Sequence, residues 1–181
     1  MSSYLETHRL RLRQWQVTDL SGLRALCTDA KVMEFFPAPL QEREILAFYQ
    51  RHQAAIGERG FGFWAVERKD CGEFIGFVGL NAPRFDAHFV PCLEIGWRLL
   101  PDAWGQGFAT EAANACLQFG FDRLGADEIV SFTARVNKRS QAVMQRIGMQ
   151  TSDADDFEHP LVAVGDRLRP HVLYRKRAPA L

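Results

Sequence analysis

The sequence predicts a mixed α/β fold in which helices cover both faces of one sheet. Two patterns support this prediction. Strand-like runs on either side of the turn residues Lys69–Gly72 indicate an antiparallel hairpin, and a strand–helix–strand unit follows between residues 93 and 136. A hairpin builds an antiparallel sheet, whereas a strand–helix–strand unit places a helix on a sheet face. The two together therefore favour a mixed sheet.

Composition predicts one ordinary globular domain spanning residues 1–181. The 181 residues contain no repeat, low-complexity tract or linker, and 47% of them are hydrophobic. The 22 Lys and Arg balance the 22 Asp and Glu, so the chain has no overall attraction for nucleic acid or an anionic membrane. No apolar run approaches the roughly 18–20 residues of a membrane helix. With no secretory signal visible, we expect a cytoplasmic protein.

The first half of the chain gives clear element signals. Residues 9–13 alternate Arg and Leu, which is typical of a strand with one buried face. Thr18 and Asp19 are cap residues for a helix that runs on through Leu26, and a second helix is predicted over about 41–57. The strands of the hairpin are predicted at 61–66 and 74–80.

The second half alternates strands and helices. In order, the predicted elements are a strand at 93–99, a helix from 108 to about 124, a strand at 129–136, a helix at 140–147, and short strands near 149–151 and 172–174.

Cysteine and histidine spacing predicts no metal site. The four cysteines, Cys27, Cys71, Cys92 and Cys116, form no close ligand pair, and the five histidines show no ligand spacing. With no secretory signal, we expect reduced thiols.

Two glycines, Gly105 and Gly107, stand between the strand at 93–99 and the following helix. Such a turn lets the backbone approach a ligand, and the free N–H groups of the first helical turn favour phosphate. No Walker A loop is present, and Thr110 stands where a dinucleotide fingerprint requires its third glycine. The hypothesis of a nicotinamide-dependent oxidoreductase is therefore supported by the two glycines alone. A purely structural helix start is the other alternative.

The run from Leu93 to Ala112 resembles motif A of the GNAT acetyltransferases. The opening Leu5–Arg13 with Asp19, and the later Asn137–Ser140 with Val143 and Ile147–Met149, are similar to the branch that includes the ribosomal-protein N-terminal acetyltransferases of the RimJ/RimL type. The wider superfamily pattern Arg/Gln-x-x-Gly-x-Gly/Ala is met by Gly107 and Ala109, with Trp104 at its first position.

This resemblance implies the three-layer GNAT fold, with a mixed, mostly antiparallel sheet that splays between the fourth and fifth predicted strands, 93–99 and 129–136. Acetyl-CoA, the acyl donor, would lie in the splay, with its pantetheine arm along Trp97–Leu99 and its pyrophosphate on the N–H groups from Gly105 to Thr110. The implied cofactor-binding residues are Trp97, Arg98, Leu99, Trp104, Gly105, Gln106, Gly107, Phe108, Ala109, Thr110 and Asn137.

Two residues are candidates for proton transfer. Glu94, an acid within an apolar strand, is a candidate general base, or alternatively an edge or outward-facing carboxylate paired with Arg98 or another arginine. The resemblance suggests Ser140 as the group that protonates the CoA sulfur. Alternatively, Asn137 caps the helix and Ser140 merely occupies its first turn. Met144 stands where many relatives carry a tyrosine as general acid.

The expected function is direct transfer of an acetyl group to a primary amine, on a protein N-terminus or a small molecule, by a monomer or homodimer. Three acids, Glu34, Glu42 and Glu44, are candidates to attract a cationic amine, or else solvated helix acids. The alternative is a non-catalytic acyl-CoA-binding sensor. Neither nucleic acid nor a membrane is an expected partner.

Overall fold

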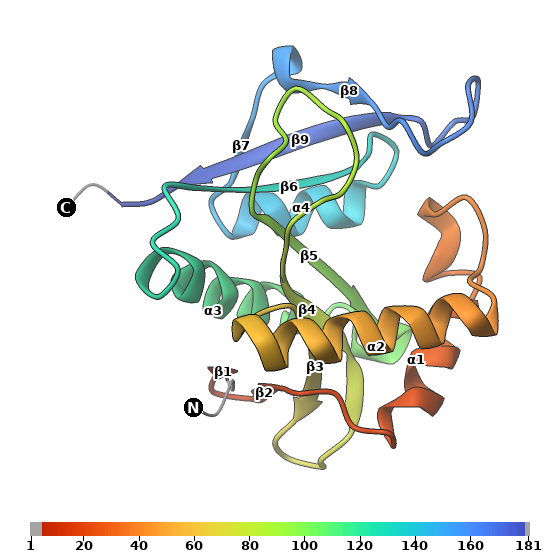
Figure 1. Ribbon diagram of the computed structural model, residues 1–181, viewed down its shortest axis with the longest axis vertical. Helices are drawn as coiled ribbons and strands as arrows, with labels where there is room; N and C mark the ends of the chain where they lie inside the picture. Colours follow the sequence, from red (N-terminus) through yellow and green to blue (C-terminus); the bar gives the residue numbers. More distant parts are fainter. Residues whose placement is uncertain (1–4, 180–181) are drawn as a thin grey trace.

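A computed structural model describes residues 5–179, in which one sheet carries helices on both faces (Figure 1). Its strands lie in the order β1-β2-β3-β4-β5-β6-β9-β7, with β8 paired to β9. The strands are β1 (Leu5–Glu6), β2 (Leu10–Arg13), β3 (Phe63–Arg68), β4 (Phe74–Asn81), β5 (Glu94–Leu99), β6 (Glu128–Ala134), β7 (Gln150–Thr151), β8 (Phe157–Glu158) and β9 (Pro170–Arg177). The helices are α1 (Asp19–Thr28), α2 (Glu42–Arg59), α3 (Phe108–Asp122) and α4 (Lys138–Arg146), with 3₁₀ turns η1 (Met33–Phe35), η2 (Pro101–Ala103) and η3 (Asp153–Asp155).

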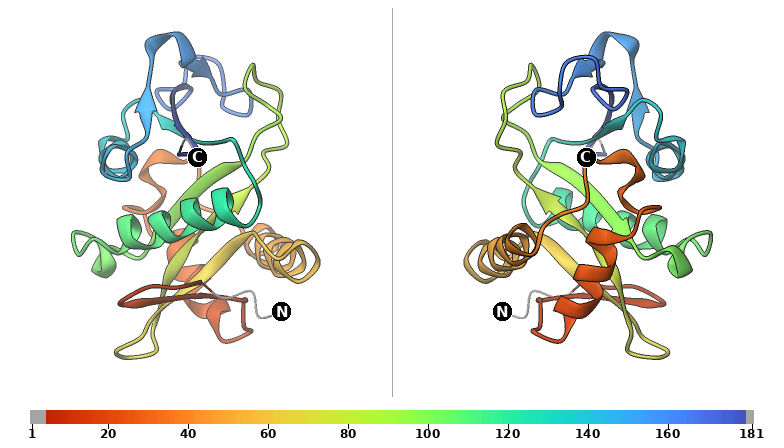
Figure 2. Two further views of the ribbon diagram at one scale, coloured as in Figure 1. Left: turned by 90° about the vertical axis from the view of Figure 1, so that its left-hand side faces the viewer. Right: turned by 90° about the vertical axis from the view of Figure 1, so that its right-hand side faces the viewer.

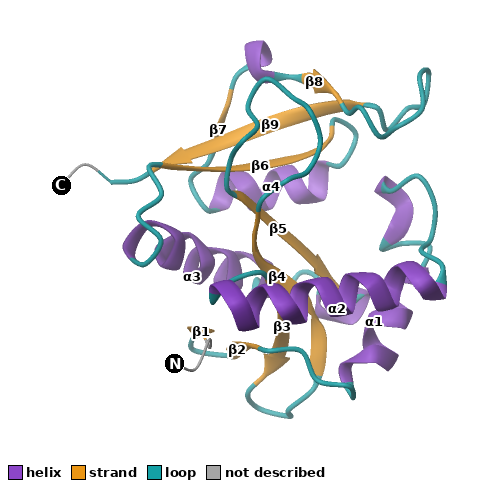
Figure 3. Ribbon diagram, in the orientation of Figure 1, coloured by secondary structure: helices purple, strands orange, loops and turns teal. Residues whose placement is uncertain are grey.

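Alternation along the strands distributes the core between two helical layers. In β3, Phe63 faces the α2 side, where its ring lies 6.2 Å from that of Phe48. The next residue, Trp64, faces the opposite side and meets Phe119 of α3 at 5.4 Å. Figure 2 shows α2 and α3 on opposite faces of the sheet, and in Figure 3 α2 crosses in front of the strands.

The sheet opens between β5 and β6. These two strands are parallel and share one register pair, Glu94 with Val130, whereas the other strand pairs are antiparallel. The N–H of Val130 donates to the carbonyl of Leu93 at 2.9 Å, and beyond this point the strands diverge (Figure 1). The predicted mixed sheet with a splay is therefore confirmed. The splay lies between the fifth and sixth observed strands, which are the fourth and fifth predicted ones, because the sequence did not predict β1.

Element ends follow local chemistry. Helix α2 begins at Glu42 because Gln41 and Glu44 form a reciprocal capping box. It ends at Arg59, because the next residue, Gly60, has a φ of 79°, which only glycine adopts without strain. Strand β9 extends well beyond the predicted 172–174, because it pairs with β6 along its whole length. The two-residue strands β1 and β8 gave no sequence signal, since each depends on a neighbouring strand.

The predicted cap at Thr18 and Asp19 is corrected. Thr18 makes no side-chain cap, and Asp19 is instead the first residue of α1. Its carboxylate accepts from both terminal nitrogens of Arg13 at 2.8 Å and from the N–H of Gln16 at 2.8 Å. Arg13 and Asp19 are 5% and 2% exposed, so this is a buried ion pair that fastens the start of α1 to β2. None of the helices within residues 5–179 is long and apolar enough to span a bilayer.

Candidate active site

A cavity of about 1050 Å³ lies where β5 and β6 separate, and every layer of the fold contributes to its wall. From the α1–α2 side come Val32, Phe35, Phe36 and Phe48; from β5 come Glu94, Gly96, Trp97, Arg98 and Leu99; from the following turn come Trp104, Gly105 and Gly107–Thr110; and from β6 to α4 come Ser131–Ala134, Asn137–Ser140, Val143 and Met144. The tertiary structure thus brings Glu94 and Ser140 to one cavity with all predicted cofactor residues except Gln106.

The turn before α3 has the conformation that its two glycines predict. Gly105 and Gly107 adopt φ values of 73° and 78°, in the left-handed region, and Gly107 is the N-cap residue of α3. No side chain of the described chain caps this helix end. Because Ala109 and Thr110 line the cavity, the uncapped first turn borders it. A helix start of this kind suits an anionic ligand.

Side chains on either side hold this turn in place. Trp104 donates its Nε1 hydrogen to the carbonyl of Leu99 at 2.8 Å, which ties the turn to the end of β5. Arg9 donates to the carbonyl of Gln106 at 2.9 Å and pairs with Glu111 at 2.7 Å. The Gln106 side chain bonds the carbonyl of Asp102 and does not line the cavity, so only its backbone remains a candidate contact.

Glu94 is a half-buried carboxylate on the face of β5 that looks toward α1 and α2. Burial raises its pKa to about 7, opposed by a weak hydrogen bond in which Asn81 Nδ2 donates to Oε2 at 3.4 Å. The alternative pairing with Arg98 is not observed, because the guanidinium of Arg98 instead approaches the Cys27 thiol at 3.6 Å. A carboxyl group with a pKa near neutrality is suited to accept a proton.

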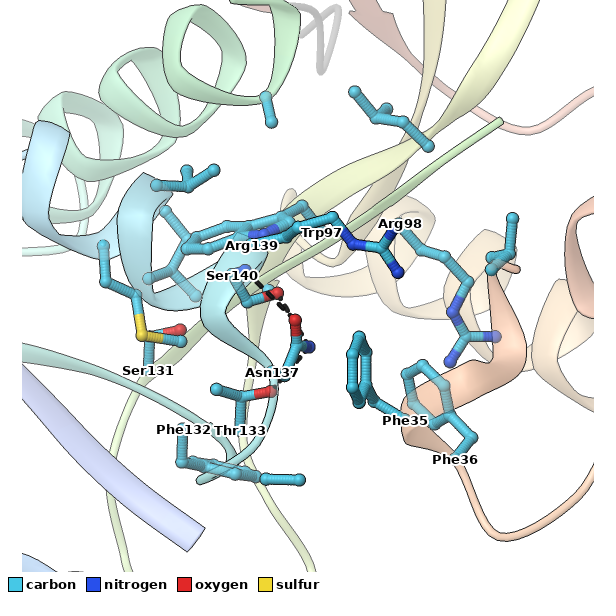
Figure 4. Close-up of a pocket in the computed structure, with 18 of the residues that line it drawn as sticks. Phe35, Phe36, Trp97, Arg98, Ser131, Phe132, Thr133, Asn137, Arg139 and Ser140 are labelled. Carbon is cyan, nitrogen blue, oxygen red and sulfur yellow. Dashed lines mark hydrogen bonds between the residues drawn. The ribbon is translucent and has the colours of Figure 1, made fainter. Parts of the chain in front are cut away.

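Asn137 and Ser140 form a small network at the start of α4 (Figure 4). Asn137 Oδ1 accepts from the N–H of Ser140 at 3.2 Å, so Asn137 does cap the helix. Its Nδ2 donates to Thr133 Oγ1 at 2.9 Å and to Ser140 Oγ at 3.1 Å. Since Ser140 Oγ accepts from Asn137, its own hydrogen stays available to another acceptor.

Met144 is 1% exposed and forms part of the cavity wall, so its position offers no ionisable group. Sequence reasoning missed two further residues in that wall, His159 and His171, whose rings lie 4.7 Å apart. Burial lowers the pKa of His159 to about 4 and also lowers that of His171. Twelve positions separate them in the chain, and the pairing of β8 with β9 brings them together. Residues 5–179 contain no cluster of three or more metal-ligating side chains.

The fold and the cavity together define an acetyltransferase. Residues 9–150 match the family model described as "Acetyltransferase (GNAT) domain", and the chain belongs to this family. YkkB, an uncharacterized protein of Bacillus subtilis (strain 168), is 32% identical over 166 residues, which cover 90% of this chain and 94% of YkkB. The uncharacterized N-acetyltransferase YoaA of the same organism is 29% identical over 83% of this chain and 84% of its own.

Solved structures of acetyltransferases have the same fold as this chain. The acetyltransferase from Agrobacterium tumefaciens str. C58 superposes with a TM-score of 0.78 at 26% identity, over 97% of this chain and 94% of that one. Two more distant structures share the fold alone. RimL, a ribosomal L7/L12 α-N-protein acetyltransferase in complex with coenzyme A, gives 0.76 at 18% identity over 96% and 97% of the two chains. Spermidine N-acetyltransferase from Vibrio cholerae, in complex with CoA and spermine, gives 0.73 at 19% over 94% and 96%.

Proposed function

We propose that this protein transfers an acetyl group from acetyl-CoA directly to a primary amine, on a protein N-terminus or a small molecule. The observation that carries the proposal is one cavity whose wall includes both an uncapped helix start, suited to a phosphate group, and a carboxylate of raised pKa. We further propose that the chain belongs to the RimJ/RimL branch of the family, a proposal that the RimL fold likeness and the sequence motifs support. We also propose a single domain over 1–181, acting in the cytoplasm as a monomer or homodimer, without nucleic acid or a membrane as partner.

The residues present fit acetyl-CoA. The edge of β5 that faces β6 is unpaired beyond Glu94, so the backbone of Trp97–Leu99 would hold the pantetheine arm. The uncapped turn from Gly105 to Thr110 would hold the pyrophosphate, and Asn137, which follows β6, lines the same cavity. When bound, acetyl-CoA supplies the thioester-activated acetyl group.

In this scheme Glu94 removes a proton from the acceptor. A primary amine is mostly protonated at neutral pH, and only its neutral form attacks a carbonyl carbon. The Glu94 carboxylate, ionised above its pKa of about 7, takes that proton directly or through one water molecule. Ser140 Oγ, which accepts from Asn137 Nδ2, donates its own hydrogen toward the departing sulfur.

Replacement of Ser140 by alanine tests this second role. We expect Ser140→Ala to lower kcat by roughly 10²-fold, the lower end of the range for general acid catalysis, with little change in the affinity for CoA. Steady-state thiol release measures kcat, and titration with CoA measures affinity. Asn137→Ala, which removes the cap as well, is the comparison. If Ser140→Ala keeps the wild-type kcat while Asn137→Ala lowers it, the loss of activity comes from the missing helix cap, and Ser140 is not the proton donor.

The cofactor is tested by thermal unfolding with and without acetyl-CoA, with NAD and ATP as controls. At 100 times its dissociation constant a ligand adds about 2.7 kcal/mol to the free energy of unfolding, which for a chain of this size raises Tm by roughly 5–10 °C. We expect a shift with CoA species alone. Gly107→Ala strains a φ of 78° and should reduce the shift. Gly57→Ala, in an exposed turn of α2 where a Cβ would meet only Gln14 Nε2 at 4.0 Å, should leave the shift intact.

The outcomes separate the candidate functions. Absence of a shift with acetyl-CoA would overturn the proposal. A shift without release of free thiol, across a broad panel of amines, would instead favour the non-catalytic acyl-CoA sensor. A shift with NAD in place of CoA would favour a nicotinamide-dependent enzyme.

A further inference from the structure

Arg98 carries a positive charge that the described chain leaves without a counter-charge. Its Nε is buried and has no hydrogen-bond partner, and its Nη1 meets only the Cys27 thiol at 3.6 Å. No carboxylate of residues 5–179 contributes to the charge balance at this guanidinium, and burial lowers its pKa. The rings of Phe36 and Phe77, 3.9 and 5.4 Å from Cζ, offset part of the desolvation cost but accept no strong hydrogen bond.

This guanidinium faces the side of the cavity formed by α1 and the residues that follow it, where it contacts Cys27 and Phe36. Glu94, Gly96 and Arg98 alternate along one face of β5, the face that looks toward α1 and α2. In Figure 4 the Arg98 side chain runs from β5 toward Phe36. Gly96 lies between Glu94 and Arg98 on this face, and the Phe63 ring packs over it, 3.1 Å from the position that a Cβ would take. Both charged side chains and Gly96 line the cavity.

The carboxylates that the sequence offered for a polycationic amine are already engaged. Glu34 pairs with Arg139 and Glu42 with Arg24, at 2.7 and 2.6 Å. Glu44 accepts from the N–H of Gln41 in the capping box at 2.7 Å. Among residues 5–179, Glu94 is the one carboxylate that lines the cavity, and Arg98 lies on the same face of β5 without a counter-charge.

We infer that Arg98 binds a carboxylate of the acceptor while the acceptor's amine lies at Glu94. A carboxylate supplies the hydrogen-bond acceptors that a guanidinium needs, and a buried arginine pairs with it more strongly than an exposed one does. The backbone of Arg98 is proposed to contact acetyl-CoA, whereas its side chain would select the acceptor. This role rests on the acetyl transfer proposed above.

The spacing of the two charges defines the acceptor further. Four residues along a strand separate the Cα atoms of Glu94 and Arg98 by roughly 13 Å. The side chains shift both charges from these positions, and Glu94 Oε1 lies 3.7 Å from the position that a Cβ of Gly96 would take. An acceptor that carries its amine and its carboxylate on a spacer of several atoms suits this arrangement, so the proposed acceptor class is an ω-amino acid or a short peptide with an acidic side chain near its N-terminus.

Matched acceptor pairs test this assignment. The probes are 6-aminohexanoate and 8-aminooctanoate with their carboxamides, the peptide amides Ser-Ala-Glu and Ser-Ala-Gln, and spermidine. Thiol release gives kcat/KM, and melting in the presence of CoA gives binding without turnover. We expect at least one carboxylate member to exceed its amide tenfold or more in kcat/KM and to raise Tm further. Arg98→Gln should abolish that preference and Arg98→Lys should reduce it.

Arg43→Gln is the control, because it removes an exposed positive charge of α2 outside the cavity and should retain the preference. Four outcomes would each overturn the role of Arg98. Two concern the wild-type protein's choice of acceptor: equal rates within every pair, or a preference for spermidine. The other two are an equal loss of rate on both members of a pair in Arg98→Gln, and no acetylation of any probe by protein that binds acetyl-CoA. Failure to bind acetyl-CoA, measured first, would overturn the proposed function itself. If Arg98→Gln does not fold, Arg98→Lys carries the comparison.

Discussion

Replacement of Glu94 by glutamine is expected to lower kcat/KM by roughly 10²–10⁴-fold, the range typical of a general base. Burial raises the pKa of Glu94 to about 7, so the carboxylate is largely protonated at pH 6 and ionised at pH 8. The ratio of wild-type to variant kcat/KM should therefore rise tenfold per pH unit below 7 and level off above it. The ionisation of the amine substrate affects both proteins equally and cancels in this ratio, so the pH dependence that remains reports the ionisation of Glu94.

Stability separates this loss from misfolding. A carboxyl group whose pKa rises from 4.5 to about 7 on folding destabilises the folded state once the pH exceeds its unfolded pKa, because the buried group must then ionise. Glutamine removes that cost, so Glu94→Gln should melt at or above the wild-type temperature at pH 8. Glu58→Gln, an exposed neutralisation on α2, is the activity control. A pH profile unchanged in Glu94→Gln would exclude Glu94 as the base.

Replacement of Asp19 by alanine is expected to lower the free energy of unfolding by about 3 kcal/mol, because the guanidinium of Arg13 would stay buried without this ion-pair partner. Asp19 accepts two hydrogen bonds from Arg13 at 2.8 Å, and these raise the pKa of the guanidinium, which stays charged. Arg13 retains Glu67 at 2.6 Å, which places the loss at the lower end of the known range. For a chain of this length the loss corresponds to a Tm lower by roughly 6–12 °C.

The matched control is Asp70→Ala, which removes an equivalent ion pair from the surface. Asp70 lies 2.5 Å from Arg68 but is 65% exposed, so water and salt replace the lost contact and the unfolding midpoint should not move measurably. Urea denaturation of both variants measures the difference. Similar losses in the two would show that burial does not determine the strength of the Asp19 pair.

Local chemistry explains which parts of the fold were predictable. The hairpin, the helix starts and the Gly105–Gly107 turn depend on residues close together in the chain, and the structure has them within a few residues of the predicted ends. Thr18 is the instructive exception. Its cap was predicted from residue type, but Asp19 is drawn instead to Arg13 on a neighbouring strand.

The candidate site was predictable only in part. Motif resemblance placed Glu94, Ser140 and the glycine turn in one region, and the cavity does bring them together. His159 and His171 gave no signal, because strand pairing rather than spacing makes them neighbours. Gln106 is assigned to the cofactor through its backbone N–H, and its side chain bonds the carbonyl of Asp102, a contact that the sequence does not predict.

By itself the sequence determined the order of the elements, the mixed sheet and the glycine turn, because periodicity and backbone conformation depend on residues close together in the chain. Only the tertiary structure decided which charges are paired. Glu94 lies against Asn81 rather than Arg98, the acids Glu34 and Glu42 are taken up by other arginines, and Arg98 is left facing the cavity. Burial and charge pairing depend on groups from several elements at once, and no local pattern encodes them.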